Sequence, residues 1–230
     1  MSFFRSSKSK GHSNRKPFSK KRLFVQVSLM IFLASLANAE SISSTSHSGR
    51  MAVLDSYSAE GRGDYQQAID KMMPLFTTAP QDYFVNYRLG WLFYLKKNYK
   101  NAIGHYSNAE KTDLTSLEPL LGLTAVYLAV GNYSQLLSVS ERLLARDPKN
   151  YYGMQRYVTA QIKLKNFPAA LAKTQDALAV YPSDAIFLEQ KAFAQMSLNS
   201  VKEAQETLSH LILISPRNEY ARMILGHGQR

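Results

Sequence analysis

The chain has 230 residues, 45% of them hydrophobic and 11% aromatic, which is enough for a folded core and excludes global disorder. It contains no cysteine, which excludes disulfides, thiolate zinc sites, iron–sulfur clusters and a cysteine nucleophile. The net charge is +11, but eight of the 28 basic residues precede Glu40, where there is no acidic residue. The rest of the chain has 20 basic and 17 acidic residues, so its net charge is only +3. This small charge does not indicate nucleic-acid binding.

The N-terminal segment has the layout of a secretory signal peptide. Basic residues at 20–22 precede an apolar run over 23–37, and a small-x-small motif ends at Ala39. The run is shorter than the roughly 20 residues that span a bilayer. We predict a cleaved signal peptide over 1–39, with an uncleaved inner-membrane anchor or a transit peptide as the alternatives. A polar, flexible linker is expected over 40–48.

After the linker, one pattern recurs with a period of about 34 residues, a length typical of helical repeats. It consists of a turn-forming pair followed by a larger apolar residue, at Gly63-Asp64-Tyr65, Lys97-Asn98-Tyr99, Gly131-Asn132-Tyr133, Lys165-Asn166-Phe167 and Asn199-Ser200-Val201. Prolines recur in the same frame, at Pro80, Pro148, Pro182 and Pro216. Five full units are expected to begin at residues 49, 83, 117, 151 and 185, and a partial sixth at 219.

Each unit is predicted to be a pair of antiparallel helices. Apolar residues recur at i, i+3 and i+4 in both halves of a unit. Gly63 and Gly131 can take the left-handed conformation that ends a first helix, and proline stops the second helix. Gly90 is expected to face Ala102 where the two helices approach closely. Because one pair cannot bury both of its faces, the units must stack on one another.

This frame resembles the tetratricopeptide repeat (TPR), and the resemblance covers residues 49–230. It implies an all-α, right-handed superhelical solenoid of five helix pairs with a partial C-terminal capping helix. It also implies an interaction scaffold whose first helices line a groove for a protein or peptide. By repeat position, the groove residues would be Tyr57, Phe84, Tyr87, Trp91, Tyr94, Leu121, Ala125, Tyr152, Arg156, Thr159, Glu189, Phe193 and Met196.

Four of these positions form an aromatic stripe in the second unit. Phe84, Tyr87, Trp91 and Tyr94 are spaced by three, four and three positions, which places them on one side of a helix. As a groove surface, such rings would suit peptide side chains or the apolar faces of sugars. The alternative is that the stripe is core, buried against the first unit or the linker.

No residue is predicted to be catalytic, and no metal or cofactor is expected. Glu206 and His210 lie four apart on a helix but lack further ligands, so they are interpreted as a solvated pair. Some TPR modules clamp a C-terminal carboxylate with Lys, Asn and Arg. Here the groove positions offer Arg88 and Arg156 without the Lys and Asn, so that type of binding is not expected.

Together these features predict an exported, periplasmic scaffold that binds a protein or peptide. The resemblance suggests a role in envelope assembly, secretion or polysaccharide export. A carbohydrate-binding accessory of polysaccharide export and an inner-membrane-anchored scaffold are the alternatives. Nucleic acid is not expected as a partner, and the membrane would be contacted only through an uncleaved N-terminal segment.

Overall fold

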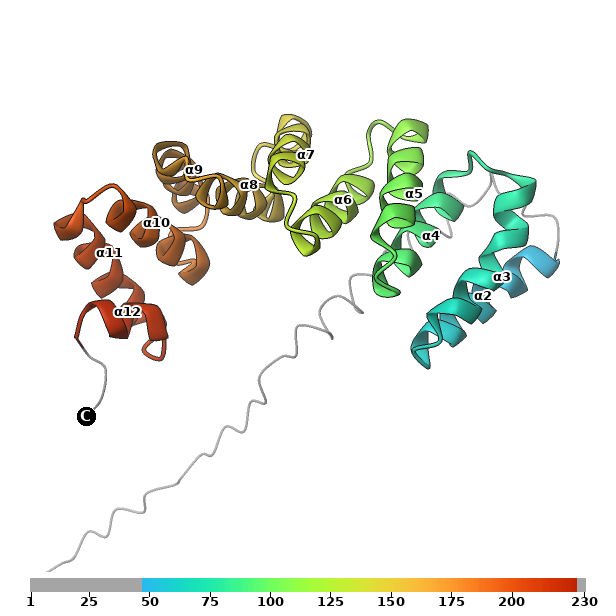
Figure 1. Cartoon of the computed structure of the whole chain (residues 1–230), viewed down its shortest axis with the longest axis horizontal. Coiled ribbons are helices and arrows are strands. Elements are labelled where there is room, and N and C mark those ends of the chain that lie inside the picture. Colours follow the sequence, from blue (N-terminus) through green and yellow to red (C-terminus); the bar gives the residue numbers. More distant parts are fainter. Residues whose placement is uncertain (1–46, 227–230) are drawn as a thin grey trace, which may run out of the picture. The chain divides into compact units, whose positions relative to one another are not determined.

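The computed structural model describes residues 47–226, which form eleven helices and no strand (Figure 1). The predicted signal peptide, its cleavage site and residues 40–46 of the predicted linker lie outside the described residues. The first helix begins at His47, so the last two residues expected in the linker are helical. The all-α prediction is confirmed.

The helices alternate between first and second members of successive pairs (Figure 1). The first helices are α2 (His47–Gly61), α4 (Tyr83–Leu95), α6 (Glu118–Ala129), α8 (Tyr151–Lys163) and α10 (Ala185–Ser197). The second helices are α3 (Tyr65–Thr78), α5 (Tyr99–Thr112), α7 (Tyr133–Arg146), α9 (Phe167–Val180) and α11 (Val201–Ile214), and α12 (Glu219–Ile224) follows. Each helix packs on the next along the chain, and α4, α6, α8 and α10 also contact one another in succession. This is the packing of a solenoid.

The turn inside each pair contains one residue in the left-handed region. The five residues and their φ angles are Gly63 (79°), Lys97 (63°), Gly131 (70°), Lys165 (60°) and Asn199 (63°). They occupy the same position in every unit, and only two of them are glycine. The repeat therefore imposes this conformation even on lysine, for which it is unfavourable by about 1 kcal/mol.

Exchanging lysine and glycine at these turns should therefore have opposite effects on stability. Lys97→Gly is expected to stabilise the fold by roughly 0.5 kcal/mol, because relief of the left-handed strain exceeds the entropy that glycine adds to the unfolded chain. Gly63→Lys should lose a similar amount, roughly 0.5 kcal/mol, since a Cβ there meets no atom within 4 Å and only the backbone strain, less the entropy that glycine gives the unfolded chain, opposes it. Urea denaturation measures both, and shifts of the same sign would contradict this account.

Prolines end the second helices. Pro80, Pro148, Pro182 and Pro216 each lie two positions beyond the last residue of α3, α7, α9 and α11. Pro119 lies instead in the first turn of α6, where its missing N–H costs no hydrogen bond. The proline frame thus marks the end of four of the five second helices in residues 47–226, and Leu114 takes that position after α5.

A tyrosine fills the junction between the second and third units. Tyr106 of α5 is 2% exposed. A Cβ added at Gly90 of α4 would lie 2.7 Å from its ring, and one at Gly122 of α6 would lie closer still. The expected approach of Gly90 to Ala102 stays a prediction, while the three side-chain atoms nearest to a Cβ at Gly90 all belong to Tyr106. The two glycines leave the space that this ring occupies.

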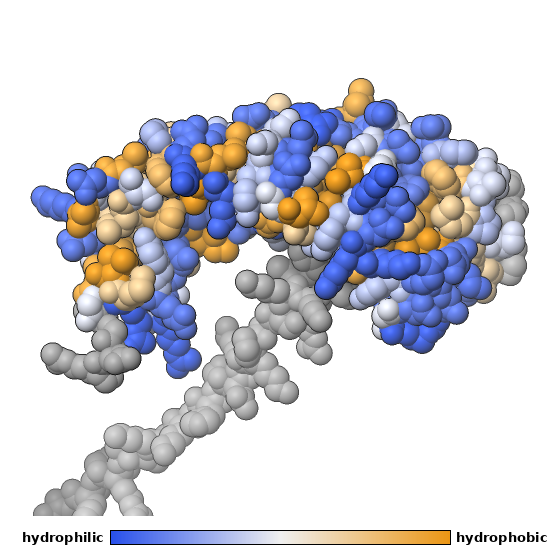
Figure 2. All heavy atoms as spheres, in the orientation of Figure 1, coloured by the Kyte–Doolittle hydropathy of each residue, from blue (hydrophilic) through white to orange (hydrophobic). Residues whose placement is uncertain are grey.

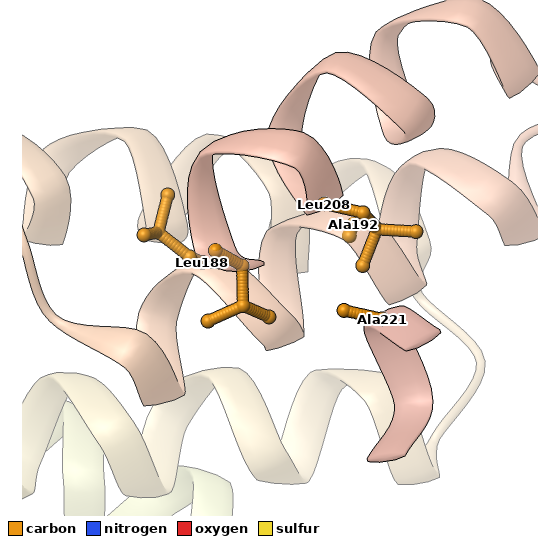
Figure 3. Close-up of a cluster of buried hydrophobic side chains, with 5 residues drawn as sticks. Leu188, Ala192, Leu208 and Ala221 are labelled. Carbon is orange, nitrogen blue, oxygen red and sulfur yellow. The ribbon is translucent and has the colours of Figure 1, made fainter. Parts of the chain in front are cut away.

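The last helix covers the apolar end of the fifth pair. Leu188 and Ala192 of α10 pack with Leu208 and Leu211 of α11, and Ala221 of α12 completes this cluster (Figure 3). All five are buried. Helix α12 thereby occupies the position that the first helix of a further unit would take.

Candidate partner-binding surface

We call the predicted groove positions the first-helix face, because α2, α4, α6, α8 and α10 carry them. Of the predicted aromatic and arginine groove residues, only Arg88 is fully buried. Tyr152 and Phe193 are exposed, at 39% and 40% of their surface. The others are partly buried: Tyr57, Phe84, Tyr87, Trp91, Tyr94 and Arg156. Figure 2 shows hydrophobic residues at the surface over the last helices.

The aromatic stripe of α4 consists of rings that pack on one another. Tyr87 lies parallel to Tyr83, with centroids 6.2 Å apart, and Tyr94 stacks on Trp91 at 5.8 Å. The ring of Tyr87 also lies 5.9 Å from that of Tyr106. Burial raises the pKa of the Tyr87 hydroxyl well above its ordinary value. The rings of the stripe are therefore partly buried and partly exposed, which neither the groove interpretation nor the core interpretation described.

A buried charge network joins α2 to α4. Arg88, only 2% exposed, forms an ion pair with Glu60 and donates a hydrogen bond to Ser56 at 3.1 Å. Its guanidinium lies 3.7 Å from the centre of the Tyr57 ring. The other oxygen of Glu60 accepts a hydrogen bond from the Trp91 indole at 2.7 Å. The expectation that Arg88 lies open on the groove face is wrong, because it is buried and paired with Glu60 of the preceding unit.

This network changes the interpretation of two predicted groove residues. Tyr57 and Trp91 both contact the Arg88–Glu60 pair, so they fix the terminal pair of helices as well as contributing surface. Burial is the largest of the effects that raise the pKa of Tyr57, and the nearby Arg88 partly opposes it. Glu60 and Arg88 lie at facing positions of neighbouring units. Only a comparison of such positions along the sequence could have predicted this network.

Arg156 differs from Arg88 in having no acidic partner within residues 47–226. It lies on α8, partly buried, and interacts electrostatically with Tyr94 and Tyr152. Burial lowers the pKa of its guanidinium, and these two tyrosines partly oppose that shift. Arg156 therefore places a positive charge on the first-helix face.

Further along the face, α8 and α10 are joined by a polar contact. The Gln190 amide donates to Thr159 Oγ1 at 3.1 Å, while its oxygen is buried without a hydrogen-bond partner among the described residues. Phe193 packs edge-on against Phe167 of α9 and also lies against Tyr220 of α12, both at 6.3 Å. Its ring is held by neighbours yet remains exposed on one side.

A separate polar hollow lies between α5 and α7, away from the first-helix positions. Its lining residues are Ser107, Glu110, Lys111, Leu114 and Arg142. Arg142 and Arg146 both bind Glu110, at 2.6 and 3.2 Å, so the strongest charges beside the hollow already neutralise one another. The hollow therefore offers a ligand less unpaired charge than Arg156 does.

Residues 47–226 contain neither a metal-binding cluster nor a helix suited to a membrane. No group of three or more His, Asp and Glu side chains is placed to hold a metal ion there. None of the helices in this range combines the length and the apolar character needed to cross a membrane. Glu206 and His210 are both exposed on α11.

The sequence matches no protein-family model and no curated protein, whereas solved structures share its fold. A tetratricopeptide repeat protein from Parabacteroides merdae ATCC 43184 aligns with a TM-score of 0.71 at 17% identity, over 79% of this chain and 72% of its own. MamA from Desulfovibrio magneticus RS-1 gives 0.68 at 16% identity, over 76% and 98%. YrrB, described as a TPR protein with an unusual peptide-binding site, gives 0.65 at 14% identity, over 76% and 89%. The chain therefore has the tetratricopeptide-repeat fold.

Proposed function

We propose that this protein is a non-enzymatic scaffold that binds a partner protein or peptide through the first-helix face. The observation that carries the proposal is the set of aromatic side chains on the first helices α2, α4, α8 and α10, with exposed rings at Tyr152 and Phe193. The same face carries Arg156, which has no ion-pair partner within residues 47–226. Aromatic residues and arginine are the side chains that most often dominate binding energy at protein interfaces. The likeness to YrrB, a TPR protein with a peptide-binding site, supports the same class of partner.

Site-specific photo-crosslinking in the native host tests this proposal. A photoreactive amino acid at Tyr152 or Phe193 should give adducts with a partner protein. The same residue at Gln135 or Gln205, exposed positions on the second helices α7 and α11, should not. Adducts from the second-helix positions alone would place the interface elsewhere.

We further propose that the scaffold works in the periplasm, in envelope assembly, secretion or polysaccharide export. The support is the order of basic, apolar and small residues before Glu40. Protein purified from the envelope should then have an intact mass that begins at Glu40. A full-length chain in the membrane fraction would instead support the inner-membrane-anchored scaffold.

A polysaccharide is the second candidate partner. Trp91 and Tyr94 stack at 5.8 Å and present adjoining rings, which can pack on the apolar faces of sugars. Trp91 is the only tryptophan, so its fluorescence reports on this position alone. Titration with envelope polysaccharide should change the emission if a sugar binds there, and an unchanged spectrum would eliminate this candidate.

A further inference from the structure

The turns between the two helices of each unit line one side of the stack, which we call the turn edge. It comprises the same six positions of every unit: 61–66, 95–100, 129–134, 163–168 and 197–202. The first two turns meet, because Lys96 donates a hydrogen bond to Gln66. Since α4, α6, α8 and α10 contact one another in succession, the later turns follow along the same side.

Charge is divided unevenly between the turn edge and the joining loops, which connect one unit to the next. The turn edge holds one acidic residue, Asp64, and seven basic ones: Arg62, Lys96, Lys97, Lys100, Lys163, Lys165 and Lys202. The joining loops hold six acidic and two basic residues, over the windows 79–84, 113–118, 147–152, 181–186 and 215–220. The small net charge of the chain beyond residue 39 therefore conceals one strongly positive edge.

The positive charge of the turn edge is accessible from solvent. All seven basic side chains are exposed. None of them forms an ion pair with another residue of the range 47–226. Arg62 and Lys96 donate hydrogen bonds, but to uncharged side chains. The edge therefore carries cations that the described part of the chain does not neutralise, and an anionic surface would be complementary to it.

Aliphatic side chains lie among these cations. The residue directly after each first helix is basic in the first two units and aliphatic in the next three: Arg62, Lys96, Val130, Leu164 and Leu198. The three aliphatic side chains are 46%, 41% and 38% exposed. A site for a soluble polyanion needs charge alone, whereas a surface that rests on a bilayer combines basic with apolar side chains. The composition of the turn edge therefore favours a bilayer.

We propose that the turn edge docks on a bilayer surface that contains anionic phospholipids. The basic side chains are attracted to the anionic headgroups, and the aliphatic ones enter the boundary between headgroups and acyl chains. This inference goes beyond the proposed function, because the turn edge shares no residue with the first-helix face. It also differs from the expectation that only an uncleaved N-terminal segment would contact the membrane.

The absence of cysteine from the chain allows a position-specific test. Leu198→Cys attaches an environment-sensitive fluorophore to the turn edge, and Ser183→Cys attaches it to an exposed position of a joining loop. In the full chain, vesicles of phosphatidylcholine with phosphatidylglycerol should shift the emission at 198 to the blue and leave that at 183 unchanged. Vesicles of phosphatidylcholine alone should shift neither. Because the two labels differ only in position, an N-terminal segment that also binds the vesicles does not produce this difference.

Substitutions then separate the contribution of charge. Replacing the three lysines of the second turn by glutamine should reduce the shift at 198 at least about tenfold, measured at one lipid concentration below saturation. The combination of Lys111→Gln, Lys149→Gln and Arg217→Gln removes the same charge at or beside the joining loops and should leave the shift nearly unchanged. Melting temperatures should be similar for both variants, because all the substituted side chains are exposed.

A second variant separates a bilayer from an acidic protein. Val130→Gln with Leu164→Gln keeps the net charge and should still weaken the shift on vesicles, because less apolar surface enters the bilayer. If this variant keeps the full shift, and soluble polyglutamate shifts the label as vesicles do, the edge is a site for an acidic protein and the membrane proposal is wrong. The proposal is also overturned by equal shifts at 198 and 183, by no shift at 198, or by a shift that survives loss of the three lysines.

Discussion

Glu60→Gln is expected to destabilise the N-terminal helix pair by about 3 kcal/mol, because it leaves the charge of Arg88 buried without its partner. Arg88 keeps only 2% of its side chain exposed, while Glu60 keeps 21%, which places the loss at the lower end of the range for buried pairs. Glutamine keeps the shape and can still accept the indole hydrogen bond of Trp91, so the charge is the main change.

The loss should be local, because units of a solenoid contact only their neighbours. Amide hydrogen exchange is expected to accelerate in α2 and α3 and to change little in α10 and α11. Asp55→Asn is the control, since its ion pair with Lys71 is 47% and 45% exposed and should contribute less than about 1 kcal/mol. Equal effects of the two substitutions would mean that the buried network does not hold α2 in place.

Removing the charges of both Glu60 and Arg88 distinguishes the loss of their ion pair from the loss of packing around them. The double variant Glu60→Leu with Arg88→Met is expected to recover most of the stability lost in Glu60→Gln, because an apolar pair of similar volume carries no desolvation cost. A double variant less stable than Glu60→Gln would show that packing around Tyr57, rather than charge, is the main contribution.

Gly122→Ala is expected to cost about 2–3 kcal/mol, near the upper end for overpacking by a single methyl group. Its Cβ would overlap the Tyr106 ring, which is itself enclosed at the junction of two units and cannot move aside freely. Urea denaturation measures the loss. Gly90→Leu should be at least as severe, because the same ring lies 2.7 Å from that Cβ and leucine adds three further carbons.

Gly104→Ala on α5 is the matched control. That position is exposed and an added Cβ meets no atom within 4 Å, so alanine should stabilise the helix by up to about 1 kcal/mol. Combining Gly122→Ala with Tyr106→Leu should restore part of the loss, because the smaller side chain vacates the contact. If Gly122→Ala behaved like Gly104→Ala, the ring would not lie between the two helices.

The sequence by itself determined the architecture of residues 47–226. The repeat frame predicted helix pairs, and the structure has them, because the signals that end each helix are local. A left-handed residue closes each first helix and a proline follows most second helices. Such signals act within a few residues of chain, so they can be interpreted without knowing what packs against the helix.

The tertiary structure alone decided what meets between helices and across unit boundaries. Gly90 lies against the Tyr106 ring, and Glu60 neutralises Arg88. Arg156, at the same repeat position, has no such partner among the described residues. The physical reason is that the two members of each pair come from different helices, so their meeting depends on how helices cross and how units stack. By repeat position alone, Arg88 and Arg156 are equivalent. Their surroundings differ because the stacking of units brings different residues against each of them.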